Sequence, residues 1–231
     1  MLRVYSGGRF ELRRSTAIAL PRRVVVCVFA KPPVPGRTKT RLAAAIGDRQ
    51  AAKLAEAMLC DVWSAVCRVS EVDSVLASAG GGSFPKALSD AVLWQQGDGD
   101  LGARLERMLR RGLSQADAAI AVGSDVPQLR AEHIRETVRE LEHNEAVLGP
   151  SPDGGYYLLG VTRCPSGLLD GIPWSCERTF ETTIARLGDH GFSVRTLQPL
   201  GDVDVVEDLR ILSNGLPCGA ATRAWLEQFV G

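Results

Sequence analysis

The sequence has no excess of charge of either sign, because 27 Lys and Arg residues balance 27 Asp and Glu residues. A neutral chain offers no general positive field to nucleic acid, so we expect no nucleic-acid partner. It also lacks a cationic amphipathic face and any apolar run near the roughly 20 residues that cross a bilayer, so we expect no membrane partner. With 231 residues, 45% of them hydrophobic, the chain can still bury a substantial core.

None of the six cysteines forms a Cys-x-x-Cys pair, which argues against a zinc or redox motif. Free thiols are typical of a reducing compartment, and we expect a cytoplasmic protein. Residues 1–23 contain six arginines and no long apolar segment, unlike a secretory signal. We interpret residues 1–23 as an N-terminal extension, with a strand around Phe10–Leu12, and residues 24–231 as a single domain.

Two common catalytic signatures are missing as well. The Gly-x-x-x-x-Gly-Lys-Ser/Thr spacing of a Walker loop is absent. Ser124 has no Gly-x-Ser-x-Gly frame, so a hydrolase is unsupported. The three histidines, His133, His143 and His190, fall in or at the ends of surface-type helical patterns, and we interpret them as solvated rather than as catalytic bases.

What the sequence does contain is an alternation of strand-like and helix-like segments, which predicts an α/β/α sandwich around a mostly parallel sheet. The expected strands cover residues 24–30, 72–78, 91–94, 118–122, 146–148, 156–161 and 192–197. The expected helices cover residues 48–69, with Asp48 as the cap, and residues 101–113, 132–143, 180–189, 206–212 and 220–229. Ligands of such sheets bind beyond the carboxyl ends of the strands, so the loops after residues 30 and 122 and around 200–204 are the places to expect a site.

The loop after the first strand is rich in proline and carries four cations, Lys31, Arg37, Lys39 and Arg41. Gly36 permits a tight turn within it. A cationic loop between a buried strand and a helix is suited to binding phosphate groups. We therefore predict a phosphate site at this loop.

Acidic residues follow two later parts of the predicted sheet. Asp125 comes directly after a buried strand, where it could ligate Mg²⁺ or Mn²⁺ or cap the next helix. Asp202 and Asp204 alternate on an extended segment and face the same side, where two like charges are costly unless a cation lies between them or one carboxyl is protonated. Glu207 and Asp208 suit the first turn of the following helix and are not expected as ligands.

Two further stretches supply candidate residues. Asp153 precedes Gly154 and Gly155, which is typical of a hairpin and also lets a substrate approach the backbone closely. Between residues 95 and 104, either Asp98 or Asp100 is expected to cap a helix. Two neighbours on that helix are expected near a ligand in the same crevice, namely Gly102 and Arg104.

Together these motifs resemble the DUF2064 family of nucleotide-diphospho-sugar transferase-like proteins, the transferase 1 group associated with radical-SAM and selenodomain gene sets. The matching stretches are Ala30-Lys-Pro-Pro-Val-Pro-Gly-Arg-Thr-Lys-Thr-Arg-Leu42, Gly99-Asp-Leu-Gly-Ala-Arg104, Gly123-Ser-Asp-Val-Pro-Gln-Leu129, Ser151-Pro-Asp-Gly-Gly-Tyr-Tyr-Leu-Leu-Gly160 and Ile172-Pro-Trp-Ser175. The Lys-Thr-Arg-Leu and Asp-Val-Asp segments are also similar to 2-phospholactate guanylyltransferases.

The resemblance implies a GT-A fold that binds a nucleotide together with Mg²⁺ or Mn²⁺. Carried over to this sequence, it places Lys31, Lys39 and Arg41 on the nucleotide phosphates. It makes Asp125 a metal ligand, with Asp202 or Asp204 as the second ligand. It assigns the acceptor side to Asp153, Gly154, Gly155, Trp174 and Ser175.

Three functions remain open at this point. The first is nucleotidyl transfer from an NTP to a small phosphorylated or phosphonate-like acceptor, with release of pyrophosphate. The second is glycosyl transfer from an NDP-sugar, with Asp153 as a base, and the third is nucleotide binding without catalysis. The density of cations favours the first. The nucleobase, the acceptor and the formation of a homodimer stay open.

Overall fold

A computed structural model of the protein describes residues 23–230, built around one seven-stranded sheet. The strands lie in the order β3-β2-β1-β4-β6-β5-β7. Their bounds are β1 Val24–Ala30, β2 Val72–Ser78, β3 Val92–Gln95, β4 Ala118–Gly123, β5 Ala146–Pro150, β6 Tyr156–Val161 and β7 Val194–Thr196. Only β6 runs against the others, since it pairs antiparallel with both β4 and β5. The predicted mostly parallel sheet is confirmed, whereas the strand expected at Phe10–Leu12 lies outside the described residues.

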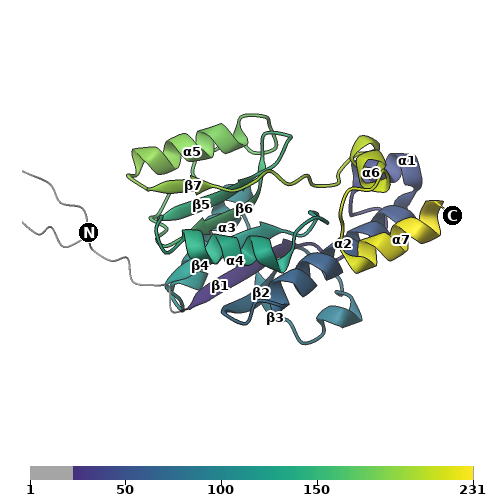
Figure 1. Ribbon diagram of the computed structural model, residues 1–231, viewed down its shortest axis with the longest axis horizontal. Coiled ribbons are helices and arrows are strands. Elements are labelled where there is room, and N and C mark those ends of the chain that lie inside the picture. Colours follow the sequence, from purple (N-terminus) through teal and green to yellow (C-terminus); the bar gives the residue numbers. More distant parts are fainter. Residues whose placement is uncertain (1–22, 231) are drawn as a thin grey trace, which may run out of the picture.

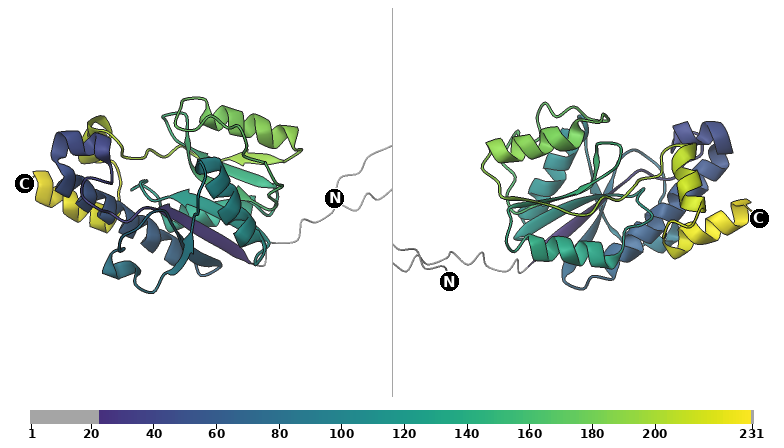
Figure 2. Two further views of the ribbon diagram at one scale, coloured as in Figure 1. Left: turned by 180° about the vertical axis from the view of Figure 1, so that it is seen from behind. Right: turned by 45° about the horizontal axis from the view of Figure 1, so that its top comes forward.

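Helices cover both faces of this sheet. Their bounds are α1 Thr40–Ile46, α2 Asp48–Cys67, α3 Leu101–Leu113, α4 Ala131–Glu140, α5 Thr179–Asp189, α6 Val206–Ser213 and α7 Ala220–Val230, with a 3₁₀ turn at Lys86–Leu88. Helices α2 and α4 lie on one face, and α3 and α5 lie on the other (Figures 1 and 2). The α/β/α sandwich expected from the sequence is therefore present.

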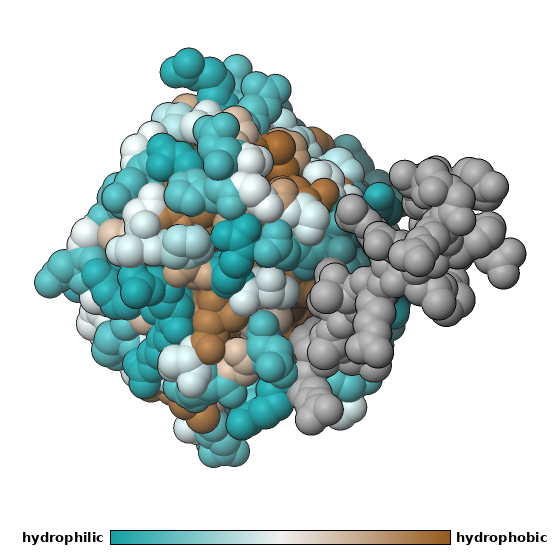
Figure 3. Space-filling model, turned by 90° about the vertical axis from the view of Figure 1, so that its left-hand side faces the viewer, coloured by the Kyte–Doolittle hydropathy of each residue, from teal (hydrophilic) through white to brown (hydrophobic). Residues whose placement is uncertain are grey.

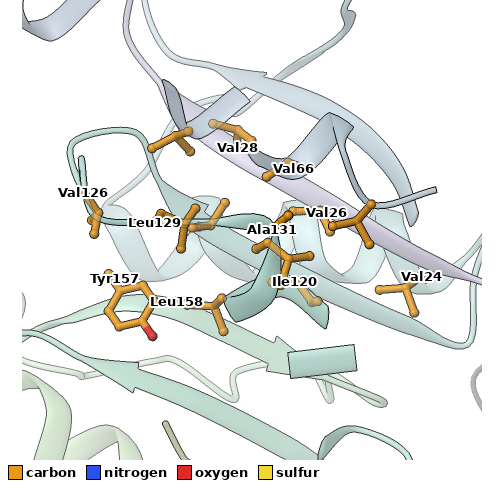
Figure 4. Packing of buried hydrophobic residues seen from close by; sticks show 14 of the residues in the cluster. Val24, Val26, Val28, Val66, Ile120, Val126, Leu129, Ala131, Tyr157 and Leu158 are labelled. Atoms are coloured by element: carbon orange, nitrogen blue, oxygen red, sulfur yellow. The ribbon is translucent and has the colours of Figure 1, made fainter. Parts of the chain in front are cut away.

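Alternating side chains of the central strand β1 reach the two helical layers. Val24, Val26 and Val28 pack with residues of α2 and α4, as the close view in Figure 4 shows for part of this cluster. Val25 and Cys27 point the other way, into a cluster with Met108 of α3. Because both faces are covered, the strand reads as a continuous apolar run rather than an alternating one. Burial raises the pKa of the Cys27 thiol to about 12, as expected of a thiol that serves packing.

A second group of helices packs at one end of the sheet, on the right in Figure 1. There α1, α2, α6 and α7 surround a separate apolar cluster whose members include Leu42, Met58, Leu209 and Trp225. The carboxylate of Asp61 on α2 accepts hydrogen bonds from the first backbone amides of α7, at 2.9 Å from Ala221 N and 2.8 Å from Thr222 N. This cluster fixes the position of α1 relative to α2, α6 and α7.

The first two helices differ from the sequence expectation. Helix α1 was not predicted as a separate element, and Asp48 is not a cap. Instead Gly47 adopts a φ of 82°, which ends α1 and precedes α2, so that Asp48 is the first residue inside α2. A glycine with a positive φ ends α1 before α2 begins, whereas the sequence pattern did not separate a helix after the cationic loop from the helix expected at residues 48–69. Elsewhere the observed ends match those expected or differ from them by a few residues.

Hydrophobic residues reach the surface in patches between hydrophilic ones on the face shown in Figure 3. The edge strand β3 exposes two of the large apolar side chains, Val92 and Leu93. Between residues 23 and 230, no helix combines the length and the apolar character needed to span a membrane.

Candidate active site

A cleft of about 670 Å³ opens at the carboxyl ends of β1 and β4. Its walls come from the loop after β1, from α1 and α2, and from the start of α3. The charged residues that line it are Lys31, Arg37, Lys39, Arg41, Arg104, Asp100, Asp125 and Asp204. The structure thus brings the cationic loop and two of the three candidate metal ligands into one cleft, although these residues are far apart in the sequence.

The cationic loop is shaped by its own hydrogen bonds. The Thr38 hydroxyl donates to the Pro32 carbonyl at 3.2 Å and accepts from Val34 N at 3.2 Å. Gly36 takes a φ of 76°, a conformation that favours glycine. After this turn the side chains of Lys39 and Arg41 reach Asp125 and Asp204.

Lys39 lies at the centre of the site. Its Nζ is 2.7 Å from Asp125 Oδ2 and 3.3 Å from Asp204 Oδ1, and its side chain is only 9% exposed. Burial acts to lower the pKa of this amine, but the nearby Asp125 and Asp204 outweigh it and raise the pKa. Lys39 therefore stays protonated and bridges two carboxylates.

The two carboxylates are held by the loops that follow β4 and precede α6. Burial acts to raise the pKa of Asp125, but Lys39 outweighs it and lowers the pKa, so this carboxylate is ionised. Val203 N donates to the Asp125 carbonyl at 3.1 Å and ties the two loops together. The second oxygen of Asp204 accepts from Arg41 Nη1 at 3.0 Å. Asp208 caps α6 by accepting from the backbone amides of Asp204 and Val205, which agrees with its expected place in the helix start.

Asp202 differs from its neighbours, because it has no ion-pair partner within the part of the chain that the structure describes. Burial, followed by the nearby charges of Asp125 and Asp153, raises its pKa to about 6. The charges of all three expected metal ligands, Asp125, Asp202 and Asp204, act on Lys39, but of these three only Asp125 and Asp204 line the cleft.

Within residues 23–230, no group of three or more His, Cys, Asp or Glu side chains is arranged to hold a metal ion. The pair Asp125 and Asp204 still offers the carboxylate oxygens that Mg²⁺ and Mn²⁺ prefer. Proteins commonly hold Mg²⁺ with one or two carboxylates plus substrate phosphates rather than with a complete protein cage. The donor set therefore fits a metal that is bound together with a phosphate ligand.

The expected acceptor side lies beside the cleft rather than in its lining. Asp153 is exposed in the turn between β5 and β6, where its Oδ1 accepts from Gly155 N at 2.9 Å. A Cβ atom on Gly154 would lie 2.2 Å from the Glu177 carbonyl oxygen, and Phe180 N donates to the Gly154 carbonyl at 2.8 Å. The turn therefore packs tightly against the segment that precedes α5.

That segment contains the other two acceptor-side candidates. Ser175 adopts a φ of 58°, and the Trp174 ring contacts Tyr156 edge-on at a centroid distance of 6.2 Å. Gly102, expected near a ligand, is buried and packs against this ring, so that a Cβ there would lie 3.0 Å from Trp174 Cζ2. The absence of a side chain at Gly102 thus serves the packing of α3.

Arg104, the other residue expected on this helix, does line the cleft, and its Nε is buried without a hydrogen-bond partner. Of the two alternatives for the cap of α3, Asp100 accepts from Ala103 N at 2.8 Å. Sequence reasoning missed Gln96 and Ser124 as lining residues. Their place directly after β3 and β4, at the carboxyl ends of parallel strands, was the signal that could have found them.

Residues 42–176 match the family described as "Uncharacterized protein conserved in bacteria (DUF2064)". The matched segment is more than half of the chain. It includes Asp125 and Arg104, whereas Lys31, Lys39 and Asp204 lie outside it. No protein with a curated function matches the sequence significantly.

Several solved structures are similar to this chain. A proposed nucleotide-diphospho-sugar transferase from Desulfovibrio desulfuricans G20 is 26% identical, with a TM-score of 0.78 over 89% of this chain and 97% of that chain. Rv0371c from Mycobacterium tuberculosis H37Rv is 19% identical, with a TM-score of 0.52 over 84% of this chain and 100% of that chain. CMP:2-keto-3-deoxy-manno-octonic acid synthetase in complex with CTP is 14% identical, with a TM-score of 0.50 over 82% and 96% of the two chains. The chain belongs to the DUF2064 family and has a GT-A-like fold, as the resemblance implied.

Proposed function

We propose that this protein is a divalent-metal-dependent nucleotidyltransferase, which uses an NTP and a small phosphorylated or phosphonate-like acceptor and releases pyrophosphate. The observation that carries the proposal is the cleft itself, which is lined by three carboxylates, Asp100, Asp125 and Asp204, and by five basic side chains, Lys31, Arg37, Lys39, Arg41 and Arg104. A triphosphate carries more negative charge than the diphosphate of a sugar nucleotide, so this density of cations favours an NTP.

The proposed reaction needs positioning and charge stabilisation rather than a protein nucleophile. An oxygen of the acceptor phosphate attacks the α-phosphorus of the NTP, the bond from that phosphorus to its bridging oxygen breaks, and pyrophosphate leaves with the bonding electrons. Lys31 and Arg41 hold phosphate oxygens, and Arg104 supplies a further donor from the opposite wall. Asp125 and Asp204, with Asp202 nearby, would hold a divalent cation that neutralises phosphate charge.

Two observations support this proposal, one on a relative and one on this chain. The synthetase of similar fold was solved with CTP bound, so the fold accommodates a nucleoside triphosphate in that protein. The carboxyl ends of the strands are the usual ligand position in open α/β sheets, and the cleft of this chain lies there.

The experiment that tests the proposal measures pyrophosphate. The full-length protein is incubated with Mg²⁺, one of ATP, GTP, CTP or UTP, and pools of small phosphorylated or phosphonate acceptors. We expect pyrophosphate release with one nucleotide, dependent on acceptor and abolished by EDTA. The absence of release with all four nucleotides, under conditions in which an NDP-sugar binds, would reject nucleotidyl transfer.

Glycosyl transfer is the second candidate, favoured by the 26% identical relative described as a proposed nucleotide-diphospho-sugar transferase. In that reaction Asp153, which is exposed beside the cleft, would accept a proton from an acceptor hydroxyl. Release of a nucleoside diphosphate from an NDP-sugar, lost in Asp153→Asn, would identify this reaction. Pyrophosphate release that is unaffected by Asp153→Asn would exclude it.

A further inference from the structure

We propose that Lys39 is an internal cation that holds the metal-binding carboxylates in the ligand-free protein and is exchanged for a metal when a metal–nucleotide complex enters. This inference rests on the proposed nucleotide and metal dependence. It adds that the protein selects the metal–nucleotide complex rather than the free ion.

The position of the ammonium group carries the inference. Lys39 Nζ lies 2.7 Å from Asp125 Oδ2 and 3.3 Å from Asp204 Oδ1, so it contacts one oxygen of each of the two lining carboxylates proposed to hold the metal. The side chains of Asp125 and Asp204 are 37% and 39% exposed, whereas that of Lys39 is 9% exposed. The carboxylates therefore remain accessible from the cleft, but their charge is already neutralised from within the protein.

The backbone of Lys39 is consistent with a residue held in place by these contacts. Its φ of 51° lies in the left-handed region, which costs a non-glycine residue free energy, and its side chain gives α1 no cap. Arg41 does not neutralise both carboxylates as Lys39 does. Its side chain is 73% exposed and contacts only the second oxygen of Asp204.

In this arrangement a divalent cation competes with the Lys39 ammonium for the same two carboxylates. A divalent cation alone must displace the ammonium from Asp125 and Asp204 and leave Lys39 without a counter-ion. A nucleotide that arrives with the metal offers phosphate oxygens to the displaced ammonium, in a cleft that Lys39 already lines. The same phosphates supply metal ligands that the protein lacks, because no group of three suitable side chains exists in residues 23–230. Metal and nucleotide binding should therefore be strongly coupled.

The test measures Mn²⁺ affinity directly, by titration calorimetry and by the EPR signal of free Mn²⁺, with and without inorganic tripolyphosphate as a base-free probe. Lys39→Met keeps the length of the side chain and removes its charge. We expect Lys39→Met to bind Mn²⁺ alone more tightly than the wild type by about 5- to 100-fold, the usual range of coupling between sites. Tripolyphosphate should strengthen Mn²⁺ binding much more in the wild type than in Lys39→Met.

Three variants complete the design. Lys53→Met removes an exposed lysine of α2 that does not line the cleft, and it should leave Mn²⁺ affinity unchanged. Lys39→Gly replaces Lys39→Met if the latter does not fold, because glycine adopts the positive φ freely. Adding Asp204→Asn to Lys39→Met should reverse the gain in affinity.

The outcomes separate the two proposals. Unchanged or weaker Mn²⁺ binding in both Lys39→Met and Lys39→Gly would overturn the role of Lys39, even if NTPs bind and react. Tighter Mn²⁺ binding in these variants supports the role of Lys39. A wild type whose Mn²⁺ affinity does not respond to any NTP would instead count against the proposed function.

Discussion

The ammonium group of Lys39 and the carboxylate of Asp125, 2.7 Å apart, join two loops that are 86 residues apart in the sequence. One loop follows β1 and the other follows β4, the neighbouring parallel strand. This contact connects the segment that precedes α1 with the rim of the sheet, and it brings two opposite charges together in the cleft.

Asp125→Asn should reduce pyrophosphate release by about 10²- to 10³-fold, the usual effect of losing one electrostatic contact to the transition state. The amide keeps the shape of the side chain but not the charge that attracts a metal and orients Lys39. The rate is measured at saturating NTP and Mg²⁺. Asp189→Asn, which changes an exposed carboxylate at the end of α5, serves as the control. Equal rates for Asp125→Asn and the wild type would contradict the assignment.

Substitution of Arg104 should affect NTP affinity, whereas substitution of Arg107 should affect the free energy of unfolding. Arg104 lines the cleft with a buried Nε that has no partner, so Arg104→Ala should weaken NTP binding about tenfold and change the free energy of unfolding little. Arg107 donates hydrogen bonds to the carbonyls of Gln96 and Asp98. Arg107→Ala should lower the free energy of unfolding by about 1 kcal/mol and leave NTP affinity nearly unchanged. Calorimetric titration and urea denaturation check both variants, and the reverse pattern would refute the role of Arg104.

Gly154→Ala should destabilise the protein more than Gly191→Ala. Both glycines have a positive φ, 85° and 72°, so alanine at either position costs about 1 kcal/mol of backbone strain. A Cβ at Gly154 would also lie 2.2 Å from the Glu177 carbonyl oxygen, whereas nothing lies within 4 Å of a Cβ at Gly191. Urea denaturation of the two variants isolates the effect of the contact. Equal losses would show that the turn and the segment before α5 separate without cost.

His133 should make stability depend on pH. Its Nδ1 accepts a hydrogen bond from Arg130 N at 3.0 Å, which requires an unprotonated nitrogen. Burial lowers the pKa of His133 from 6.5, and Arg130 adds to this effect, while Glu136 and Glu132 oppose it. The unfolded chain therefore binds more protons below pH 6.5, and the folded state loses stability as the pH falls through that value.

The measurement compares thermal unfolding at pH 7.5 and 5.5 in the wild type and in His133→Gln. Glutamine at this position can also accept from the backbone of the cap residue but does not titrate. We expect the wild type to lose more stability than His133→Gln between the two pH values. If both lose the same amount, His133 does not contribute.

Much of the fold could be predicted because its signals are local. The continuous apolar run of β1 indicated a strand buried on both faces, and the pattern of residues 101–113 gave α3 with its correct ends. The sequence also placed the cationic loop and Asp125 after strands of one sheet, from which their approach in the cleft followed. The separation of α1 from α2 could not be predicted as easily, because it depends on the backbone of a single residue, Gly47.

The contacts within the site were less predictable, since they depend on the packing of distant segments. The contacts of Lys39 with Asp125 and Asp204 were not predicted, because no local pattern links residues so far apart. The packing of Gly102 against the Trp174 ring was likewise not predicted, because these residues lie far apart in the sequence. His133 was interpreted as solvated, whereas it is half-buried and bonded to the start of α4.

Helix α1, which contributes Arg41 to the lining of the cleft, packs against the last two helices of the chain. Leu42 of α1 shares its apolar cluster with Leu209 and Trp225, which belong to α6 and α7, and these two helices follow the segment matched to the family. A chain shortened before α6 would keep every strand of the sheet but would expose this cluster to water. The geometry of the cleft thus depends partly on two helices that contribute no residue to its lining.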